Sequence, residues 1–254
     1  MNHPSPAHSP DAGIDGLFEQ LKLGAEALRT KSLEQRVQLI DRCADGIGAV
    51  AHQWVEAACR AKQIPCDSPA RAEEITAGPI ATLRFLRLLA RSLRDLAQHG
   101  SPRLPGHVTK HRGQLRVPVF PTKQLHDALL FRPMKAETWL DPSVTEQTMF
   151  AEAGQDLSTA PESASVAVVL GAGNVSSIAA TDMLSKILIE KFSVILKMNP
   201  VNDYLTPYFE TAFKPLIESN LLRIVHGGRE LGEQLIDHPI ARSIHVTGSE
   251  QTHD

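Results

Sequence analysis

The sequence predicts an α/β protein in which an amino-terminal helical region and a proline-rich β arm precede a doubly wound parallel sheet. Apolar residues recur at three- and four-residue steps through the first hundred residues, and prolines with short alternating runs follow from 101 to 160. After Pro161, short apolar runs alternate with segments of helical period. Strands that alternate with helices favour parallel pairing through right-handed crossovers.

Composition limits the class of protein. The chain has 254 residues, of which 42% are hydrophobic, so it is long enough to bury a substantial core. Its formal net charge of -3 gives no reason to expect a nucleic-acid partner. No run of about 18 apolar residues is present, so no membrane partner is expected. Three cysteines argue against a disulfide framework and favour a reducing, cytoplasmic location.

Residues 13–100 are predicted to form helices that pack on the sheet domain, after a disordered tail at 1–12. Ser32 and Gln35 have the spacing of a capping box, which opens a helix whose apolar stripe runs to Ile47. The apolar residues from Trp54 to Ala58 indicate a short separate helix. Gly78-Pro79 predicts a break before a long final helix.

Residues 101–160 contain prolines interleaved with alternating runs such as Leu115, Val117 and Val119. Prolines at this density predict edge strands or an arm, because proline cannot donate to a β ladder. Two interpretations remain open. The arm pairs with a second copy of the chain in a homo-oligomer, or it is a poorly ordered surface excursion.

Residues 161–254 are predicted to form the sheet domain, incomplete at its carboxyl end. Helices are expected from about Ser176 to Glu190, along the apolar stripe from Leu205 to Leu216, and from Leu231 to Ile236. Continuous apolar runs are typical of strands that are buried on both faces. These runs are Val166–Leu170, Val194–Leu196, Leu222–Val225 and Ile244–Thr247.

A glycine-rich turn follows the first predicted strand. Gly171-Ala172-Gly173-Asn174 places small residues where a helix amino terminus could approach a pyrophosphate. Ser176 occupies the third glycine position of the dinucleotide motif, and a tight turn needs small residues without any ligand, so both interpretations stay open. Lys197 and Asn199 come at the end of the second strand, where a ribose would lie.

Three later segments carry a resemblance to a known family. Ile224-Val225-His226-Gly227-Gly228, then His238-Pro239, then Ile244-His245-Val246-Thr247-Gly248-Ser249 occur in the order and spacing found in aldehyde dehydrogenases. Residues 165–249 therefore resemble the Rossmann-like NAD(P)-binding domain of that superfamily, and the upstream layout is compatible with it.

The resemblance implies a cofactor, NAD or NADP, and an aldehyde-type substrate. Asn174 would help to hold the oxyanion of the thiohemiacetal intermediate. Lys197, with Asn199 beside it, would contact the adenosine ribose, and Gly171 would lie in the first turn. Gly227 and Gly228 would lie beneath the cofactor, and Gly248 with Ser249 would begin a helix aimed at the pyrophosphate.

The sequence departs from the family at several positions. Gly173 stands where an aromatic residue is common, and Pro200 replaces a glutamate that holds the ribose hydroxyls, so preference between NAD and NADP is not predicted. The family's general-base glutamate and nucleophilic cysteine follow the Gly-Ser motif, after which only residues 250–254 remain. The expectation is a truncated chain that binds cofactor with negligible turnover.

Other functions are weighed against this one. The chain could be a non-catalytic dinucleotide-binding or regulatory module, a truncated product that assembles with a separate catalytic chain, or a generic nucleotide-binding α/β domain. A metal site is not expected. His107 and His111 are four residues apart, but Pro105, Gly106 and Gly113 argue against a helix that would aim both at one ion.

Overall fold

The computed structural model describes residues 13–131 and 133–248. The expectations for the tail at 1–12 and for residues 249–254, Ser249 included, lie outside the described residues. The described chain forms two compact units. One comprises residues 13–90 and 159–248, and the other comprises 91–131 and 133–158.

Helices fill the first part of the chain, as predicted. The capping box is present, because the Ser32 hydroxyl accepts from the backbone N–H of Gln35 at 3.2 Å while the Ser32 N–H donates to the Gln35 side chain at 2.9 Å. These helices are α1 (Ile14–Arg29), α2 (Leu33–Ala61), α3 (Arg71–Ile75), the π-helical turn η1 (Thr76–Ile80) and α4 (Ala81–His99), which continues into the second unit.

The expected separate helix at Trp54–Ala58 is wrong, because α2 runs without a break through both apolar stripes. Gly46 lies within this unbroken helix. A Cβ atom at Gly46 would lie 2.4 Å from the carbonyl oxygen of Ala212, so this glycine allows close helix packing rather than ending the helix. Trp54, fully buried, packs against Phe209 with ring centroids 4.9 Å apart.

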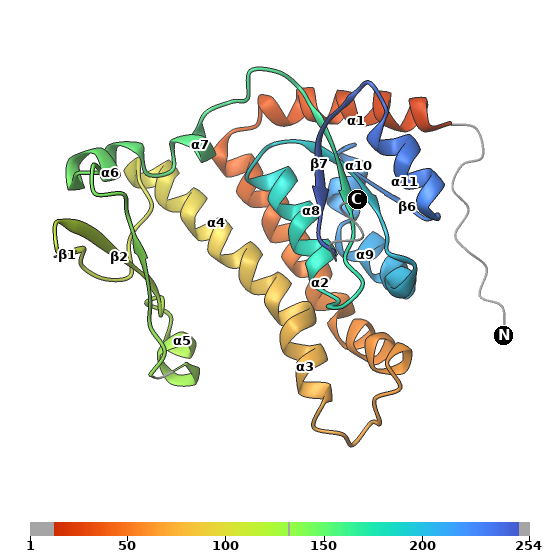
Figure 1. Cartoon of the computed structure of the whole chain (residues 1–254), viewed down its shortest axis with the longest axis horizontal. Coiled ribbons are helices and arrows are strands. Elements are labelled where there is room, and N and C mark those ends of the chain that lie inside the picture. The colour runs from red at the N-terminus through yellow and green to blue at the C-terminus, as the bar shows by residue number, and fades with distance from the viewer. Residues whose placement is uncertain (1–12, 132, 249–254) are drawn as a thin grey trace. The chain divides into compact units, whose positions relative to one another are not determined.

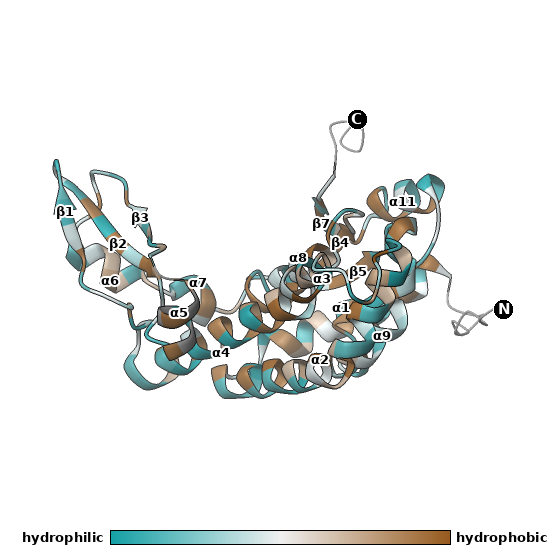
Figure 2. Ribbon diagram, turned by 90° about the horizontal axis from the view of Figure 1, so that it is seen from below, coloured by the Kyte–Doolittle hydropathy of each residue, from teal (hydrophilic) through white to brown (hydrophobic). Residues whose placement is uncertain are grey.

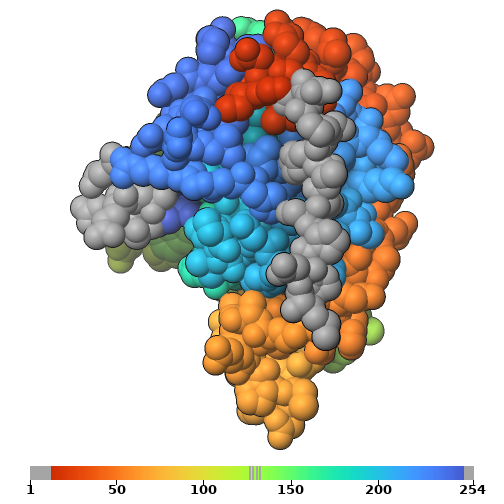
Figure 3. Space-filling view, turned by 90° about the vertical axis from the view of Figure 1, so that its right-hand side faces the viewer, coloured from red at the N-terminus to blue at the C-terminus, as the bar shows by residue number. Residues whose placement is uncertain are grey.

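The turn between α2 and α3 protrudes from the first unit (Figures 1 and 3). Two ion pairs fasten it. Lys62 Nζ lies 2.5 Å from the buried carboxylate of Glu74, and Arg71 pairs with Glu56 of α2. The predicted break at Gly78-Pro79 is confirmed, since Gly78 leaves helical geometry at φ -111° and ψ -114°.

A parallel sheet of four strands lies at the centre of the first unit (Figure 1). The strand order is β6-β5-β4-β7. The mixed α/β class with a parallel sheet is therefore confirmed. The strands are β4 (Val166–Leu170), β5 (Ser193–Lys197), β6 (Leu222–Val225) and β7 (Ala241–Val246). The connections contain α8 (Ile178–Leu188), η2 (Pro200–Leu205), α9 (Thr206–Ala212), α10 (Lys214–Glu218) and α11 (Arg229–Ile236).

Helices cover both faces of the sheet. Val166 and Val168 face a cluster that includes Phe18 of α1 and Leu235 of α11. Alternate residues of a strand point to opposite faces, so Ala167 and Val169 face the other way. Helix α8 lies against β4 and β5, and its side chains bond to β7 residues that pair with Ala167 and Val169. Among the described residues, no helix combines the length and hydropathy that a membrane span requires.

Two expected boundaries differ. The apolar stripe from Leu205 to Leu216 is divided over η2, α9 and α10, because Pro207 and Pro215 each begin a new helix. Strand β7 begins at Ala241, three residues before the predicted start. The pairing with β4 begins at Ala241, which lies opposite Val166.

The second unit contains a three-stranded antiparallel sheet in the order β1-β2-β3. Its strands β1 (Thr109–His111), β2 (Gln114–Phe120) and β3 (Ala136–Trp139) are accompanied by α5 (Leu125–Leu130), α6 (Glu146–Glu152) and α7 (Gln155–Ser158). Polar β1 is teal, and β2 carries brown apolar residues (Figure 2). Pro118 is not on an edge strand: it lies in the middle strand, where the register shifts between Pro118 and Phe120.

Candidate functional site

The carboxyl ends of the four parallel strands define one edge of the sheet. After β4 the chain adds β5 and then β6 on one side of it, and then crosses back to add β7 on its other side. The order in which strands are added therefore changes direction between β4 and β7. In open α/β sheets, ligands bind outside the carboxyl ends at such a point. The predicted site residues Gly171, Lys197, Gly227 and Gly248 all lie at or directly after these strand ends.

Gly171 brings the ends of β4 and β5 together. Its N–H donates to the carbonyl oxygen of Lys197 at 2.9 Å. A Cβ atom at Gly171 would lie 3.2 Å from that oxygen and 3.2 Å from Cβ of Ala179. The glycine is therefore needed for close approach of the strand end to its neighbour and to α8.

The rest of the glycine turn is held by the segment after β5. A Cβ atom at Gly173 would lie 3.1 Å from the side-chain amide of Asn199. That side chain caps η2 by accepting from Val201 N–H at 3.1 Å. The buried amide of Asn202 donates to the carbonyl oxygen of Ala172 at 2.9 Å. The turn is thus fixed from one side by two asparagines.

Asn174 is exposed at the tip of this turn. Its carbonyl oxygen accepts from Lys62 Nζ at 3.4 Å, and the same ammonium group pairs with Glu74. The buried Glu74 carboxylate therefore positions the Lys62 ammonium group, which donates to the backbone of Asn174.

Lys197, the last residue of β5, lies along α11. A Cβ atom at Gly232 would lie 3.6 Å from Cε of Lys197, so the glycine leaves room for the aliphatic stem. Burial lowers the pKa of Lys197, and the negative charge of Asp203 opposes that effect. Asp203 in turn bonds to His226, with its Oδ1 3.0 Å from Nδ1. A cation, a carboxylate and an imidazole therefore share this part of the edge.

Gly227 and Gly228 follow β6 as predicted. A Cβ atom at Gly227 would lie 2.7 Å from the side chain of Leu231, so a bulkier residue would displace the start of α11. Gly228 is the N-cap of α11 and would meet nothing within 4 Å. The backbone is thus open to approach at this strand end.

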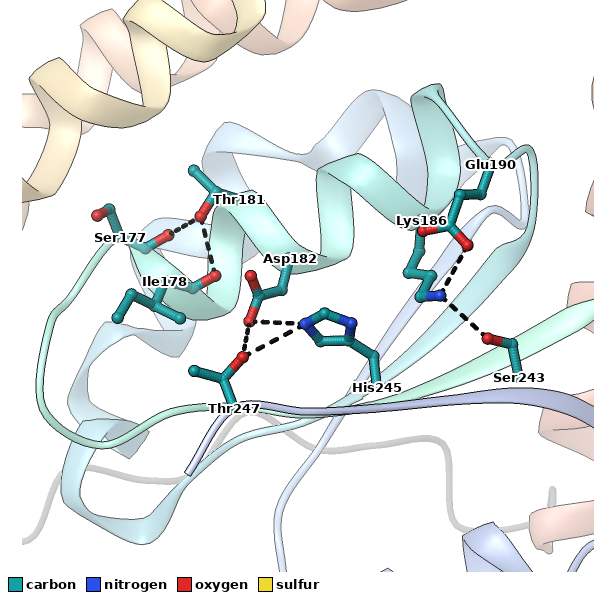
Figure 4. A network of polar contacts seen from close by, with 9 residues as sticks. All are labelled: Ser177, Ile178, Thr181, Asp182, Lys186, Glu190, Ser243, His245 and Thr247. Carbon is teal, nitrogen blue, oxygen red and sulfur yellow. Dashed lines mark hydrogen bonds and ion pairs between the residues drawn. The ribbon is translucent and has the colours of Figure 1, made fainter. Parts of the chain in front are cut away.

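Gly248 is an exposed bend two residues after the end of β7, and Ser249 lies outside the described residues. The preceding residue, Thr247, is tied to α8 (Figure 4). Its hydroxyl donates to Asp182 Oδ2 at 2.7 Å, and His245 Nε2 lies 3.2 Å from the same oxygen.

Sequence reasoning missed four side chains of this edge: Lys62, Asp182, Asn202 and Asp203. None belongs to a motif, and their roles depend on contacts between segments far apart in the chain. Asp182, five residues after Ser177, and Asp203, six residues after Lys197, were visible in the sequence, but their spacing along the chain did not indicate that they lie at one edge of the sheet.

All three cysteines come from one part of the chain. Cys43 and Cys59 are buried in α2, and Cys66 is exposed in the loop that follows. Burial raises the pKa of Cys43 to about 12, against a smaller opposite effect of Arg42. Within the described ranges, no group of three metal-ligating side chains is assembled.

Comparison with known proteins was made by sequence and by structure. No protein-family model matches the sequence, and no curated protein matches it significantly. Solved aldehyde dehydrogenases match in structure. The Δ-pyrroline-5-carboxylate dehydrogenase of Mycobacterium tuberculosis has a TM-score of 0.56 at 15% identity over 94% of this chain and 35% of its own.

Two further structures were solved with a cofactor. Aldehyde dehydrogenase C of Pseudomonas syringae, a mutant in complex with NAD+ and octanal, has a TM-score of 0.56 at 13% identity, covering 94% of this chain and 38% of its own. The putative methylmalonate-semialdehyde dehydrogenase of Sinorhizobium meliloti with NAD has a TM-score of 0.56 at 10% identity, covering 97% and 40%.

These matches show that the chain has the fold of part of an aldehyde dehydrogenase, which confirms the resemblance at the level of the fold. The chain spans about 35% to 40% of the length of the three structures named.

Proposed function

We propose that this chain is the NAD(P)-binding portion of an aldehyde dehydrogenase-like oxidoreductase. In this proposal the parallel sheet is a Rossmann-like, doubly wound unit that binds the dinucleotide outside its carboxyl edge. In this proposal the complete enzyme oxidises an aldehyde to an acid or reduces an activated acyl group. The nicotinamide of NAD(P), when bound, accepts or donates the hydride.

One observation carries the proposal: the glycine turn of β4 and the end of β5 meet through the Gly171–Lys197 hydrogen bond at 2.9 Å. A Cβ atom at Gly228 would meet nothing within 4 Å, so a pyrophosphate can approach the backbone at this position. Lys197 supplies a positive charge beside it. The residues present therefore fit a dinucleotide.

We assign roles at this edge by position. Lys197 and Asn199 contact the adenosine ribose, Gly227 and Gly228 lie beneath the cofactor, and Gly248 with Ser249 approaches the pyrophosphate. Asn174 is the candidate oxyanion donor. A preorganised amide at a developing negative charge is a large catalytic contribution.

Turnover in this family needs a nucleophilic thiol, and the three cysteines of this chain belong to α2 and the loop after it. Cys43 and Cys59 are buried in a helix, and Cys66 lies in the α2–α3 loop. A thiol whose pKa is raised to about 12, as at Cys43, is almost entirely protonated at neutral pH. We propose that the chain by itself binds cofactor with negligible turnover.

A ligand panel tests the proposal. Melting temperatures of the purified chain are measured with NAD, NADP, ATP and a flavin, each at increasing concentration. A ligand at about one hundred times its dissociation constant stabilises the fold by about 2.7 kcal/mol. The proposal expects the melting temperature to rise with NAD, with NADP or with both, and to stay unchanged with ATP and the flavin. A rise with ATP or flavin only, or with none of the four, contradicts it.

A homo-oligomer through the arm is part of the same proposal. In the described residues, β1 and β3 are the outer strands of their sheet, and Trp139 on β3 is 51% exposed. Outer strands present unpaired backbone groups that can pair with another chain. Light scattering that gives the mass of a monomer at every concentration contradicts this part.

A reducing, cytoplasmic location is proposed from the three free cysteines.

A further inference from the structure

Two buried polar side chains of the first unit have no hydrogen-bond partner among the described residues. They are the indole of Trp54, in α2, and the hydroxyl of Ser176, which lies between the glycine turn and α8. Trp54 is fully buried, and Ser176 is 2% exposed. An unsatisfied buried donor costs more free energy than an ordinary hydrogen bond contributes, so both groups are expected to be satisfied in the folded protein.

Gly78 of η1 brings these two groups to one place. A Cβ atom at Gly78 would lie 3.1 Å from Oγ of Ser176 and 3.5 Å from Nε1 of Trp54. The next atom beyond the glycine's own chain neighbours would be Cδ1 of the same indole, at 3.9 Å. Because Gly78 has no side chain, the space beside its Cα is faced by a hydroxyl and an indole N–H.

The carbonyl group of Gly78 does not satisfy the indole. It accepts from the backbone N–H of Ala81, and the buried hydroxyl of Thr82 donates to it at 3.1 Å. A carbonyl oxygen has two lone pairs, so these two donors use its capacity. The Trp54 N–H therefore needs an acceptor other than this carbonyl.

The chemistry of the pair favours one kind of occupant. An indole N–H only donates, whereas a hydroxyl both donates and accepts. A water molecule can accept from the first and bond to the second in either direction. Neither side chain carries a charge that would balance a buried ion, and an apolar group would leave both unsatisfied.

We propose that Trp54 and Ser176, beside the open side of Gly78, hold one internal water molecule. The water accepts from the Trp54 indole and hydrogen-bonds to the Ser176 hydroxyl. It joins α2 to the segment that leads from Asn174 into α8, at the point where η1 interrupts the helix. This inference does not depend on the proposed dinucleotide site.

A high-resolution crystal structure of the full chain tests the position of the water. It should show an ordered water within about 3.2 Å of both Trp54 Nε1 and Ser176 Oγ. A direct hydrogen bond between the two side chains, or no ordered water between them, overturns the inference.

The chain has only two tryptophans, so a measurement in solution is specific. In the ¹⁵N-labelled full chain, the Trp54 indole N–H should show a nuclear Overhauser effect to a long-lived water, with the same sign as the effects within the protein. Trp139, which is half exposed, is the internal control and should show only rapid exchange with bulk solvent. Identical behaviour of the two indoles overturns the inference.

Ser176→Ala removes one of the two partners of the water. It should weaken the effect between the Trp54 indole and water and shift the indole resonance. Ser177→Ala is the matched control, because it removes a buried hydroxyl from the next position and should leave both signals unchanged. Equal changes in the two variants, or none in Ser176→Ala, contradict the assignment. The wild-type crystal structure and spectrum decide the question even if Ser176→Ala does not fold.

Discussion

The backbone N–H of Gly171 donates to the carbonyl oxygen of Lys197 at 2.9 Å, so the glycine turn after β4 is fastened to the end of β5. This bond extends the β4–β5 ladder by one residue beyond the pair Leu170↔Lys197. The candidate lysine and the candidate phosphate turn are therefore positioned by one another.

Gly171→Ala tests that relationship. The new Cβ would lie 3.2 Å from a backbone oxygen and from Cβ of Ala179, neither of which can rotate away. Overpacking of this kind should lower the free energy of unfolding by about 1–3 kcal/mol and weaken cofactor binding. Urea denaturation and calorimetry measure the two effects. Wild-type values in both would show that the close approach does not matter.

Two glycines of α2 offer a prediction about packing alone. Gly46→Ala places a Cβ 2.4 Å from the carbonyl oxygen of Ala212, so it should destabilise the fold by roughly 1–3 kcal/mol. Gly48→Ala meets nothing within 4 Å and should stabilise it by roughly 0.5–1 kcal/mol, because alanine favours the helix. Equal effects from the two variants in urea denaturation would be inconsistent with the packing of α2 on α9.

Two tethers join α8 to β7, and they should have different effects (Figure 4). Asp182 holds Thr247 at the carboxyl edge, whereas Lys186 donates to Ser243 at 3.0 Å nearer the start of the strand. Asp182→Ala frees the residue before Gly248 and should raise the Kd for the cofactor about tenfold. Asp182→Asn keeps an acceptor oxygen and should restore most of the affinity.

Ser243→Ala is the control for the Asp182 variants. It removes one hydrogen bond between the same two elements and should cost about 0.5–1.5 kcal/mol of stability without changing the Kd. If Ser243→Ala and Asp182→Ala weaken cofactor binding equally, the Asp182 contact has no special role at the edge.

Cys43 predicts how stability changes at high pH. Burial raises its pKa from 9.0 to about 12, so the folded state holds this proton over a range in which the unfolded state loses it. Stability from this group is complete below pH 9 and is lost as the pH rises toward about 12. The slope approaches about 1.4 kcal/mol per pH unit. Cys43→Ala should flatten this limb in denaturation at pH 8–11, and an unchanged slope would refute the assignment.

The strands were predictable because each one is a continuous run of apolar residues that can be recognised in the sequence. The continuous apolar run Val166–Leu170 requires burial on both faces, and the structure places it in the interior of the parallel sheet. The packing role of Gly46 was not predictable, since the carbonyl group that it approaches belongs to Ala212, 166 residues further along the chain. Pro118 entered a middle strand because the ladder shifts register beside it.

The candidate site was predictable only where a strand end and a motif coincide. Gly171 and Lys197 meet as the parallel topology requires. Asp203 was missed because its contact with His226 joins residues 23 positions apart in the chain. Lys62 was missed because its contact with Asn174 spans 112 positions.

Backbone hydrogen exchange, measured with and without saturating NAD, tests the central claim most directly. If the dinucleotide binds across the carboxyl edge, exchange should slow in the turn at 171–174, after β5 at 198–199, at Gly227–Gly228 and around Gly248. Exchange in the antiparallel sheet of β1, β2 and β3 should stay unchanged. Protection confined to that sheet, or to α2 and α10, would contradict the account.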